Sequence, residues 1–402
     1  MTRNLATLSV AAIAAVVASC SSKPLDNTGG AGTGGSVAGE GGGSAGRGGA
    51  GASGGRSGGA SSRNVDILFL IDDSSSMRLS QMNLERNFPA FMRSLEGLPG
   101  GLPDLHLAVV SSDMGAGDGS ISGCTGEGKA GVFQYTNRGP CVTTTLASGA
   151  TYISNVGGVA NYTGNLTDVF SCIAALGENG CGFEQQLRSV VRALGADGRP
   201  APAENQGFLR PDAYLFIVML TNEDDCSTPP GSTLYDIASN TVLASALGPP
   251  SNFRCNEFGH LCRGSKPPRQ APSGNVTDVV TLEDCVPAEA NGMLTPVATL
   301  VTQIRALKPA PDEQIVVAAI TGPATPYQVH WKAPYAADSG PWPEITHACV
   351  ATDSSFADPA VRIGAFVNAF GANGVVLSIC ENSYAPALQI IGERIGQTIS
   401  RP

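Results

Sequence analysis

One carboxylate and two hydroxyls occupy alternate positions directly after a largely apolar run of residues. The run is VDILFLI, residues 65–71, and it leads directly into Asp72-x-Ser74-x-Ser76. Hard divalent cations bind oxygen ligands, and Mg²⁺ prefers an octahedral shell that keeps some water. A tight loop with these three side chains would supply part of a shell for Mg²⁺ or Mn²⁺, with Ca²⁺ as a further candidate. The alternative is a strand-to-helix turn, since Asp and Ser both favour capping positions.

The segments that must position this loop alternate between strand and helix patterns. Short apolar runs predict buried strands at 65–71, 104–112, 213–221, 314–321 and 374–380. Apolar residues at helical spacing predict helices at 79–95, 183–194, 294–307, 358–370 and 385–399, with Pro89 as a kink or break. This alternation indicates an α/β fold with a doubly wound, mostly parallel sheet. Ligands bind such sheets at the carboxyl ends of the strands, where Asp72 is expected.

Two long segments interrupt the alternation, at residues 113–180 and 226–292. Both are rich in Gly, Pro, Asn and Cys. We interpret them as disulfide-stapled insertions near the ligand end of the sheet, because long structureless loops are uncommon within a compact domain. The folded part is therefore expected to be one domain, residues 64–400.

The motif Asp72-x-Ser74-x-Ser76, directly after a predicted strand, resembles the metal-ion-dependent adhesion site (D-x-S-x-S) of von Willebrand factor type A domains. The resemblance covers residues 64–398 and leaves the two insertions unexplained. It implies the Rossmann-like fold of that family and a binding module in which an acidic side chain of a partner completes the metal shell. Ser74 and Ser76 would be direct ligands, and Asp72 would bind the metal or anchor a water.

The family also has an Asp just after its central strand, and this position is altered here. The strand ends in LTNEDDC, so Asn222 occupies the position and can offer a carbonyl oxygen without charge. Glu223, Asp224 and Asp225 follow at once, and Asp224 is the candidate ligand on the far side of the site. Alternatively, the acidic run is only a solvated loop.

A third family motif, a Thr shortly before the third helix, is absent from the equivalent stretch NGCGFEQQL. Glu184 is the nearest hard ligand there, although a carboxylate at this position also favours a helix N-terminus. Asp113, at the end of the second predicted strand, is a further candidate ligand.

The N-terminus reads as an export and anchoring segment. Arg3 and the apolar stretch 5–18 are typical of a signal peptide and too short for a membrane span. The following VASC resembles the lipobox of bacterial lipoproteins, which predicts a signal peptide at 1–19 and lipidation of Cys20. An ordinary signal peptide with a chance Cys is the alternative. Ser21 after that Cys favours the outer membrane of a Gram-negative cell.

Residues 20–63 are expected to form a flexible tether behind the lipidated Cys20. Residues 28–62 contain 17 Gly in 35 positions, interleaved with Ser and Ala. Such a composition cannot bury enough apolar surface to offset its chain entropy. Together with the lipobox, the tether and the Cys-rich insertions resemble a bacterial group of von Willebrand A lipoproteins.

The remaining cysteines predict a disulfide framework. Besides Cys20 there are ten, an even number that allows up to five disulfides in an exported protein. They are Cys124, Cys141, Cys172, Cys181, Cys226, Cys255, Cys262, Cys285, Cys349 and Cys380. We expect the near-neighbour pairs Cys124–Cys141, Cys172–Cys181 and Cys349–Cys380. The stretch CNEFGHLC, residues 255–262, has the ingredients of a zinc site, but disulfide bonding is favoured in an oxidising compartment.

Composition excludes one class of partner. The formal net charge is −10 with 24 Lys and Arg, and no basic cluster is present, which argues against nucleic-acid binding. We therefore predict a lipid-anchored envelope module that is not an enzyme. It would recognise a protein or surface ligand through a divalent cation, and it would contact the membrane only through its lipid. The alternatives are a metal-dependent hydrolase and a metal-free scaffold with a degenerate site.

Overall fold

The computed structural model describes residues 63–401 except for 119–120, 122, 139–140, 142–144, 239, 291 and 334–339. The predicted signal peptide, Cys20 and the tether up to Ser62 lie outside the described residues. The chain divides into two units, residues 1–57 and 58–402, and the description below concerns the second.

A seven-stranded sheet forms the centre of this unit, in the order β16-β11-β7-β1-β2-β5-β6. Its strands are β1 (Asn64–Ile71), β2 (Asp104–Ser111), β5 (Ile153–Val156), β6 (Val159–Ala160), β7 (Tyr214–Leu220), β11 (Ile315–Thr321) and β16 (Gly374–Ser378). The five strands from β16 to β2 are mutually parallel, whereas β5 and β6 pair in antiparallel fashion. The predicted α/β architecture with a mostly parallel sheet is confirmed.

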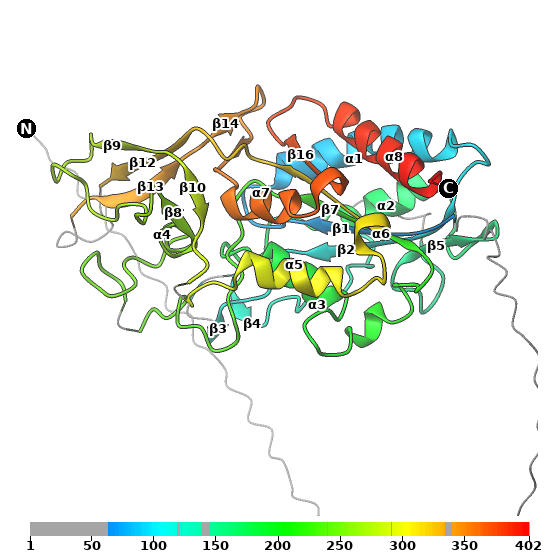
Figure 1. Cartoon of the computed structure of the whole chain (residues 1–402), viewed down its shortest axis with the longest axis horizontal. Coiled ribbons are helices and arrows are strands. Elements are labelled where there is room, and N and C mark those ends of the chain that lie inside the picture. The colour runs from blue at the N-terminus through cyan, green and yellow to red at the C-terminus, as the bar shows by residue number, and fades with distance from the viewer. Residues whose placement is uncertain are drawn as a thin grey trace, which may run out of the picture. The chain divides into compact units, whose positions relative to one another are not determined.

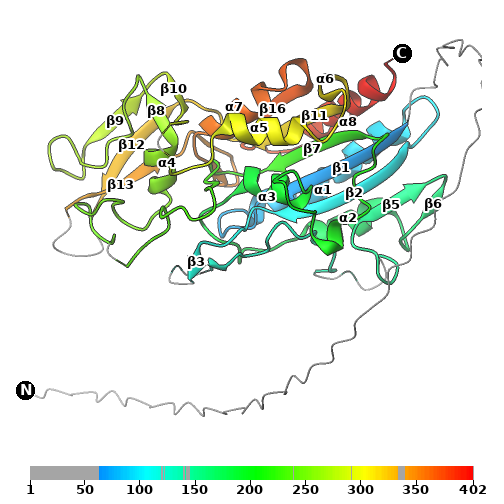
Figure 2. The ribbon, with the colours of Figure 1, turned by 60° about the horizontal axis from the view of Figure 1, so that its bottom comes forward.

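Helices cover both faces of the sheet (Figures 1 and 2). One face packs against α1 (Arg78–Glu96), α2 (Leu166–Ala174) and α8 (Ala385–Ile399). The other packs against α3 (Gln186–Ala193), α5 (Val297–Arg305) and α7 (Val361–Asn368), while the short α6 (Pro311–Gln314) precedes β11. Helix α1 continues through Pro89, so the expected break does not occur. Helix α3 begins at Gln186, three residues later than expected.

Burial on both faces explains why β1 is almost continuously apolar. Its odd-numbered residues from Val65 to Ile71 join the core beneath α1, α2 and α8, whereas Leu68 and Leu70 join the opposite core. The Phe69 ring lies 4.9 Å from the Phe170 ring, centroid to centroid. This packing fixes the strand and therefore the position of the loop that follows it.

A smaller three-stranded sheet lies beside one end of the large sheet (Figure 1). It consists of β9 (Val279–Leu282), β12 (Tyr327–Lys332) and β13 (Trp342–Thr346), paired in antiparallel fashion in the order β13-β12-β9. Next to it are α4 (Phe253–Gly259), β8 (His260–Cys262) and β10 (Cys285–Pro287). Two further two-stranded pairs are β3 (Gly117–Asp118) with β4 (Thr125–Gly126), and β14 (Cys349–Val350) with β15 (Phe356–Ala357). Short 3₁₀ turns occupy Ala203–Asn205 and Gly371–Asn373.

The two segments interpreted as insertions are more integrated than expected. The segment 113–180 adds β5 and β6 to the edge of the large sheet and α2 to its helical layer. The segment 226–292 supplies β9, which pairs with β12 from outside the segment. Apolar cores therefore cross the boundaries that composition had indicated.

All ten predicted cysteines form disulfides: Cys124–Cys181, Cys141–Cys172, Cys226–Cys255, Cys262–Cys285 and Cys349–Cys380. The expected pair Cys349–Cys380 is confirmed. The expected pairs Cys124–Cys141 and Cys172–Cys181 are wrong. In addition, Cys255 and Cys262 each pair with a cysteine outside the stretch 255–262.

The physical reason for the two wrong pairs is the path of the chain around α2. The amide of Arg138 donates to the carbonyl of Cys172 at 3.0 Å, so Arg138, three residues before Cys141, lies beside α2. Cys181 lies beyond that helix, where the Gly180 amide donates to the Asp73 carbonyl at 2.7 Å. Each cysteine is thus carried away from its neighbour in sequence.

The disulfides also bear on the compartment in which the chain folds. Five disulfides indicate an oxidising, extracytoplasmic environment, because cytosolic thiols are normally kept reduced. None of the described helices combines the length and apolar character needed to cross a bilayer.

Candidate functional site

Asp72, at the carboxyl end of β1, is held in place by hydrogen bonds of both its backbone and its side chain. Its amide donates to the Leu220 carbonyl of β7 at 2.9 Å. Its Oδ1 accepts from the Ser74 amide at 2.9 Å and the Ser112 hydroxyl at 3.2 Å, and its Oδ2 accepts from the Thr221 hydroxyl at 2.7 Å. The carboxyl is fully buried, and this burial raises its pKa although the hydrogen bonds oppose the shift.

The two serines and Asn222 converge beside this carboxylate. The Ser74 and Ser76 hydroxyl oxygens lie 3.3 Å apart. The Ser76 hydroxyl donates to Asn222 Oδ1 at 3.2 Å, and the Asn222 amide group donates to the Phe356 carbonyl at 3.1 Å, which holds Oδ1 towards the serine. The structure thus brings together the oxygen atoms of Asp72, Ser74, Ser76 and Asn222, contributed by the loops after β1 and β7.

Glu184 brings a second carboxyl to this cluster. Only 2% of the residue is exposed, and its Oε1 has no hydrogen-bond partner among the described residues. Burial raises its pKa well above the ordinary value, and the negative charges of Glu223 and Asp72 raise it further, while a hydrogen bond with the Ser74 side chain opposes them. Burying a carboxyl oxygen without a partner raises the free energy of the folded state, so a ligand, ion or water is expected beside it.

Glu223 is the third carboxyl near the loop after β1. Burial raises its pKa to about 8, and the charge of Asp358 acts in the same direction. The Asn252 side-chain amide donates to Glu223 Oε2 at 2.6 Å and opposes the shift, whereas the Asp72 charge adds to it. Glu223 therefore lies within electrostatic reach of Asp72.

Asp224 is engaged elsewhere. Its Oδ2 accepts from His260 Nε2 at 2.7 Å and from the Arg362 amide at 2.8 Å, and its Oδ1 accepts from the Ile363 amide at 3.0 Å. Burial would raise its pKa, but the hydrogen bond and charge of His260 outweigh burial and lower it. Since Arg362 and Ile363 lie in the first turn of α7, the carboxylate caps that helix.

Asp113 organises its own loop. Its Oδ1 accepts from the Gly115 amide at 2.9 Å, and its carbonyl accepts from the Lys129 amide at 2.9 Å. A Cβ at Gly128, where φ is +55°, would lie 2.1 Å from Asp113 Oδ1. The structure therefore gives Asp113 a role in close packing against Gly115, Gly128 and Lys129, and its described hydrogen bonds do not reach Ser74 or Ser76.

Sequence reasoning missed Asp73, which lies beside the candidate ligand Asp72. Its buried carboxylate forms an ion pair with Lys129 and accepts from the Ser111 hydroxyl at 2.6 Å. A Cβ at Gly180 would lie only 2.4 Å from Asp73 Oδ1, so this glycine permits the close approach of the loop before α3. The double acid after β1 offered a clue, because only one of two adjacent side chains can point into a given site.

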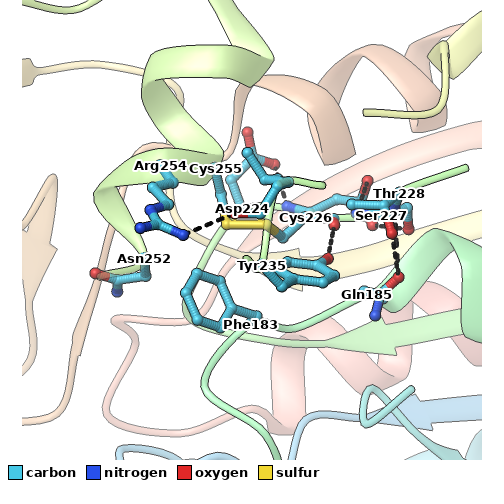
Figure 3. The surroundings of a disulfide bond; sticks show 12 residues. Phe183, Gln185, Asp224, Cys226, Ser227, Thr228, Tyr235, Asn252, Arg254 and Cys255 are labelled. Atoms are coloured by element: carbon cyan, nitrogen blue, oxygen red, sulfur yellow. Dashed lines mark hydrogen bonds between the residues drawn. A yellow bond between two sulfur atoms is a disulfide. The ribbon is translucent and has the colours of Figure 1, made fainter. Parts of the chain in front are cut away.

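The loop after β7 is clamped by the Cys226–Cys255 disulfide (Figure 3). The Tyr235 hydroxyl donates to the Cys226 carbonyl at 2.5 Å, and the Tyr235 ring lies 5.0 Å from the Phe183 ring. Figure 3 shows Tyr235 and Phe183 beside the disulfide, so the loop before α3 and the loop after β7 are packed together there.

The oxygen atoms of the site are of the chemical type that a hard divalent cation binds. They comprise one fixed carboxylate, two hydroxyls, an amide oxygen and the unpartnered Oε1 of Glu184. Among the described residues, no group of three or more His, Cys, Asp or Glu side chains is arranged to hold a metal ion. A cation here would depend on the mixed set that includes serine hydroxyls.

Comparison with protein-family models and with curated proteins finds no match for this chain. Its function therefore has to be inferred from the residues of the site.

Proposed function

We propose that this chain is a lipid-anchored binding module of the cell envelope that recognises a protein or surface ligand through a divalent cation. The observation that carries the proposal is the convergence of the Ser74 and Ser76 hydroxyls and Asn222 Oδ1 beside the immobilised carboxylate of Asp72. Mg²⁺ or Mn²⁺ suits these hard oxygens, with Ca²⁺ as the further candidate. The bound cation would offer an open coordination position to an oxygen of the partner.

We infer that the fold is doubly wound and of the von Willebrand A type. Leaving out the edge strand β6 and counting the other six in chain order, the observed order β5-β2-β1-β7-β11-β16 reads 3-2-1-4-5-6. This is the common order of doubly wound sheets, whose ligands bind outside the carboxyl ends of the strands. The loop of Asp72 leaves β1 at that end.

The envelope location is supported by the disulfides and by the N-terminal sequence. Five disulfides favour an exported protein, and the leader with Cys20 favours a lipid anchor at the outer membrane. Incorporation of radiolabelled palmitate into the wild-type chain, and its loss in Cys20→Ala, would test the anchor separately from the binding site.

Calorimetric titration of the oxidised chain without its lipid tests the cation site. We expect saturable one-site binding of Mg²⁺, Mn²⁺ or Ca²⁺ that disappears in Asp72→Ala and in the isosteric Asp72→Asn. Circular dichroism and the thermal midpoint would show whether each variant is folded. Absence of binding to the wild-type chain, or equal binding by wild type and folded Asp72 variants, would replace this proposal with the metal-free scaffold.

One observation favours the hydrolase as a second candidate function. His347 Nδ1 lies 2.7 Å from Asp358 Oδ1, and the Asp358 amide donates to the Asn222 carbonyl at 2.8 Å. Asp358 would orient the imidazole so that His347 could accept a proton from an attacking water. A cation would supply Lewis-acid polarisation of a substrate oxygen. Turnover of ester, peptide or glycan substrates that is lost in His347→Gln would support hydrolysis, and no turnover despite cation binding would contradict it.

A further inference from the structure

The Oε1 atom of Glu184 is the one carboxyl oxygen in the described part of the chain that is both buried and without a hydrogen-bond partner. It is held in place by its surroundings. The Glu184 carbonyl accepts from the Cys226 amide at 2.8 Å, and the next residue, Gln185, donates its amide to the Ser112 carbonyl at 3.0 Å. Ser112 in turn bonds Asp72, so the backbone on both sides of the carboxyl is tied to the site.

A second buried oxygen in the same region is also unpartnered. Gln186 donates its amide group to the Thr221 hydroxyl at 2.8 Å, yet its Oε1 has no partner among the described residues. Thr221 is the residue whose hydroxyl holds Asp72. Both oxygens belong to residues that adjoin the Asp72 network, and a buried acceptor without a donor calls for a cation, a water or another electropositive species.

A direct bond from the Glu184 carboxylate to the cation would decide which partner group suits the open position. Once a divalent cation is bound, the carboxylates of Asp72 and Glu184 would supply the two negative charges that balance it. A further carboxylate would enter against like charge, whereas a neutral oxygen would meet no such repulsion.

We propose that Glu184 Oε1 is a direct ligand of the cation, and that the open position therefore accepts a neutral oxygen from the partner, a hydroxyl or an amide carbonyl, in place of a carboxylate. This inference rests on the cation site proposed above. It assigns the partner's contact group by chemistry and replaces the acidic side chain that the family resemblance implied.

Titration calorimetry with Mg²⁺, Mn²⁺ and Ca²⁺ on the oxidised chain tests the ligand role. We expect Glu184→Gln to weaken cation binding by at least about tenfold, because ligand charge sets the affinity of such sites. The matched control is Glu283→Gln, which removes the same charge from an exposed carboxyl that directly follows β9 and pairs with Arg263. The control should change affinity by less than about twofold, because salt screens the charge of an exposed carboxylate.

Acetate and acetamide, which have nearly the same shape, test the choice of partner group. For the wild-type chain, acetamide should tighten cation binding and acetate should not. Methyl glucoside, which offers only hydroxyl and ether oxygens, is the third probe. It distinguishes a partner that binds through a hydroxyl from one that binds through an amide carbonyl. In Glu184→Thr, where the internal charge is gone, acetate should tighten cation binding.

Several outcomes would overturn the inference. They are unchanged affinity in Glu184→Gln, tightening of the wild-type site by acetate, and failure of both neutral probes. If Asp72→Asn loses the cation and Glu184→Gln does not, the inference fails while the proposed function stands. If Asp72→Asn binds as the wild type does, both fail. The thermal midpoint in chelator checks folding, and Glu184→Thr provides a second variant if Glu184→Gln is unstable.

Discussion

Asp224 and Asp225 are adjacent in the sequence, yet each carboxylate caps a different helix. Asp224 accepts from backbone amides in the first turn of α7, and Asp225 Oδ1 accepts from the Leu187 amide in the first turn of α3 at 3.0 Å. Both helices lie on the same face of the large sheet. Two carboxylates of the acidic run after β7 therefore join two helix N-termini to the strand end, and neither of them is solvated.

The ion pair between Asp225 and Arg362 is expected to be a major contributor to stability. Asp225 Oδ2 lies 3.0 Å from Arg362 Nη2, and both side chains are fully buried. Asp225→Asn would leave a buried guanidinium uncompensated, so we expect the free energy of unfolding to fall by about 3–5 kcal/mol. Urea denaturation of the oxidised protein measures this change.

The matched control for Asp225 is the exposed pair of Arg263 with Asp284, 3.2 Å apart. Asp284→Asn should change the free energy of unfolding by about 0–1 kcal/mol, because both groups remain solvated. Equal effects of the two substitutions would contradict the structural role assigned to Asp225.

Arg254 is expected to hold the shape of the loop between β7 and α4. The side chain is 1% exposed and donates to main-chain carbonyls only. The acceptors are Leu234, Asp236, Asn240, Gly248 and Pro249. Arg254→Met would leave several buried carbonyls without donors, each costing about 1–3 kcal/mol.

Hydrogen exchange read by mass spectrometry would test the role of Arg254. Amides of residues 234–238 and 240–248 should lose protection in Arg254→Met, while those of β1 and β7 keep theirs. Arg254→Lys retains the charge but not the fork of donors, so it should behave like Arg254→Met. Unchanged protection of the loop in both variants would refute this role.

Burial of His106 predicts that acidification destabilises the protein. Burial lowers the pKa of His106, with Arg210 acting in the same direction and the hydrogen bond to the Phe208 carbonyl opposing them. Because the folded pKa lies below the unfolded one, the unfolded chain takes up the proton first. This contribution to stability is complete above the unfolded pKa, about 6.5, and is lost as the pH falls through the folded value.

The pH dependence of the thermal midpoint in His106→Gln would isolate this contribution. Between pH 7.5 and 5 the variant should lose less stability than the wild type. Asp66, whose Oδ1 lies 3.7 Å from His106 Nδ1, remains in both proteins, and burial raises its pKa. Parallel profiles for the two proteins would rule out His106 as the source.

Peptide mapping under non-reducing conditions checks the disulfide connectivity. We expect peptides linked through Cys124–Cys181 and Cys141–Cys172. The Cys141–Cys172 bond closes a loop of 31 residues. Its removal in Cys141→Ala/Cys172→Ala should lower the free energy of unfolding by about 2–4 kcal/mol. Recovery of peptides linking Cys124 to Cys141 would contradict the fold of residues 113–180.

The core strands and much of the site loop could be predicted from local sequence. The run 65–71 is apolar because both faces of β1 are buried. The loop Asp72-x-Ser74-x-Ser76 is held by contacts between residues that are two positions apart in the sequence. Asn222 was also accessible to prediction, because β7 pairs with β1 and their carboxyl ends coincide. These features depend on interactions that are short in sequence or imposed by sheet geometry.

Features that depend on distant partners were not predictable. The direction of Asp224 is set by His260 and by α7, which lies more than a hundred residues further along the chain. The unpartnered oxygen of Glu184 results from where α3 begins, and that start is fixed by Asp225 and the Ser227 hydroxyl. Neither relation leaves a periodicity or spacing in the sequence.

The pairing of β9 with β12 limits how the segment 226–292 can be exchanged in evolution or in protein engineering. The segment 226–292 supplies one edge of a sheet whose other strands lie beyond it, and the side chains of Val280 and Leu282 pack on the cluster that includes Tyr327 and Trp331. Excising the segment would uncover an aromatic surface instead of restoring a minimal domain. The two regions therefore have to be inherited, transplanted or deleted together.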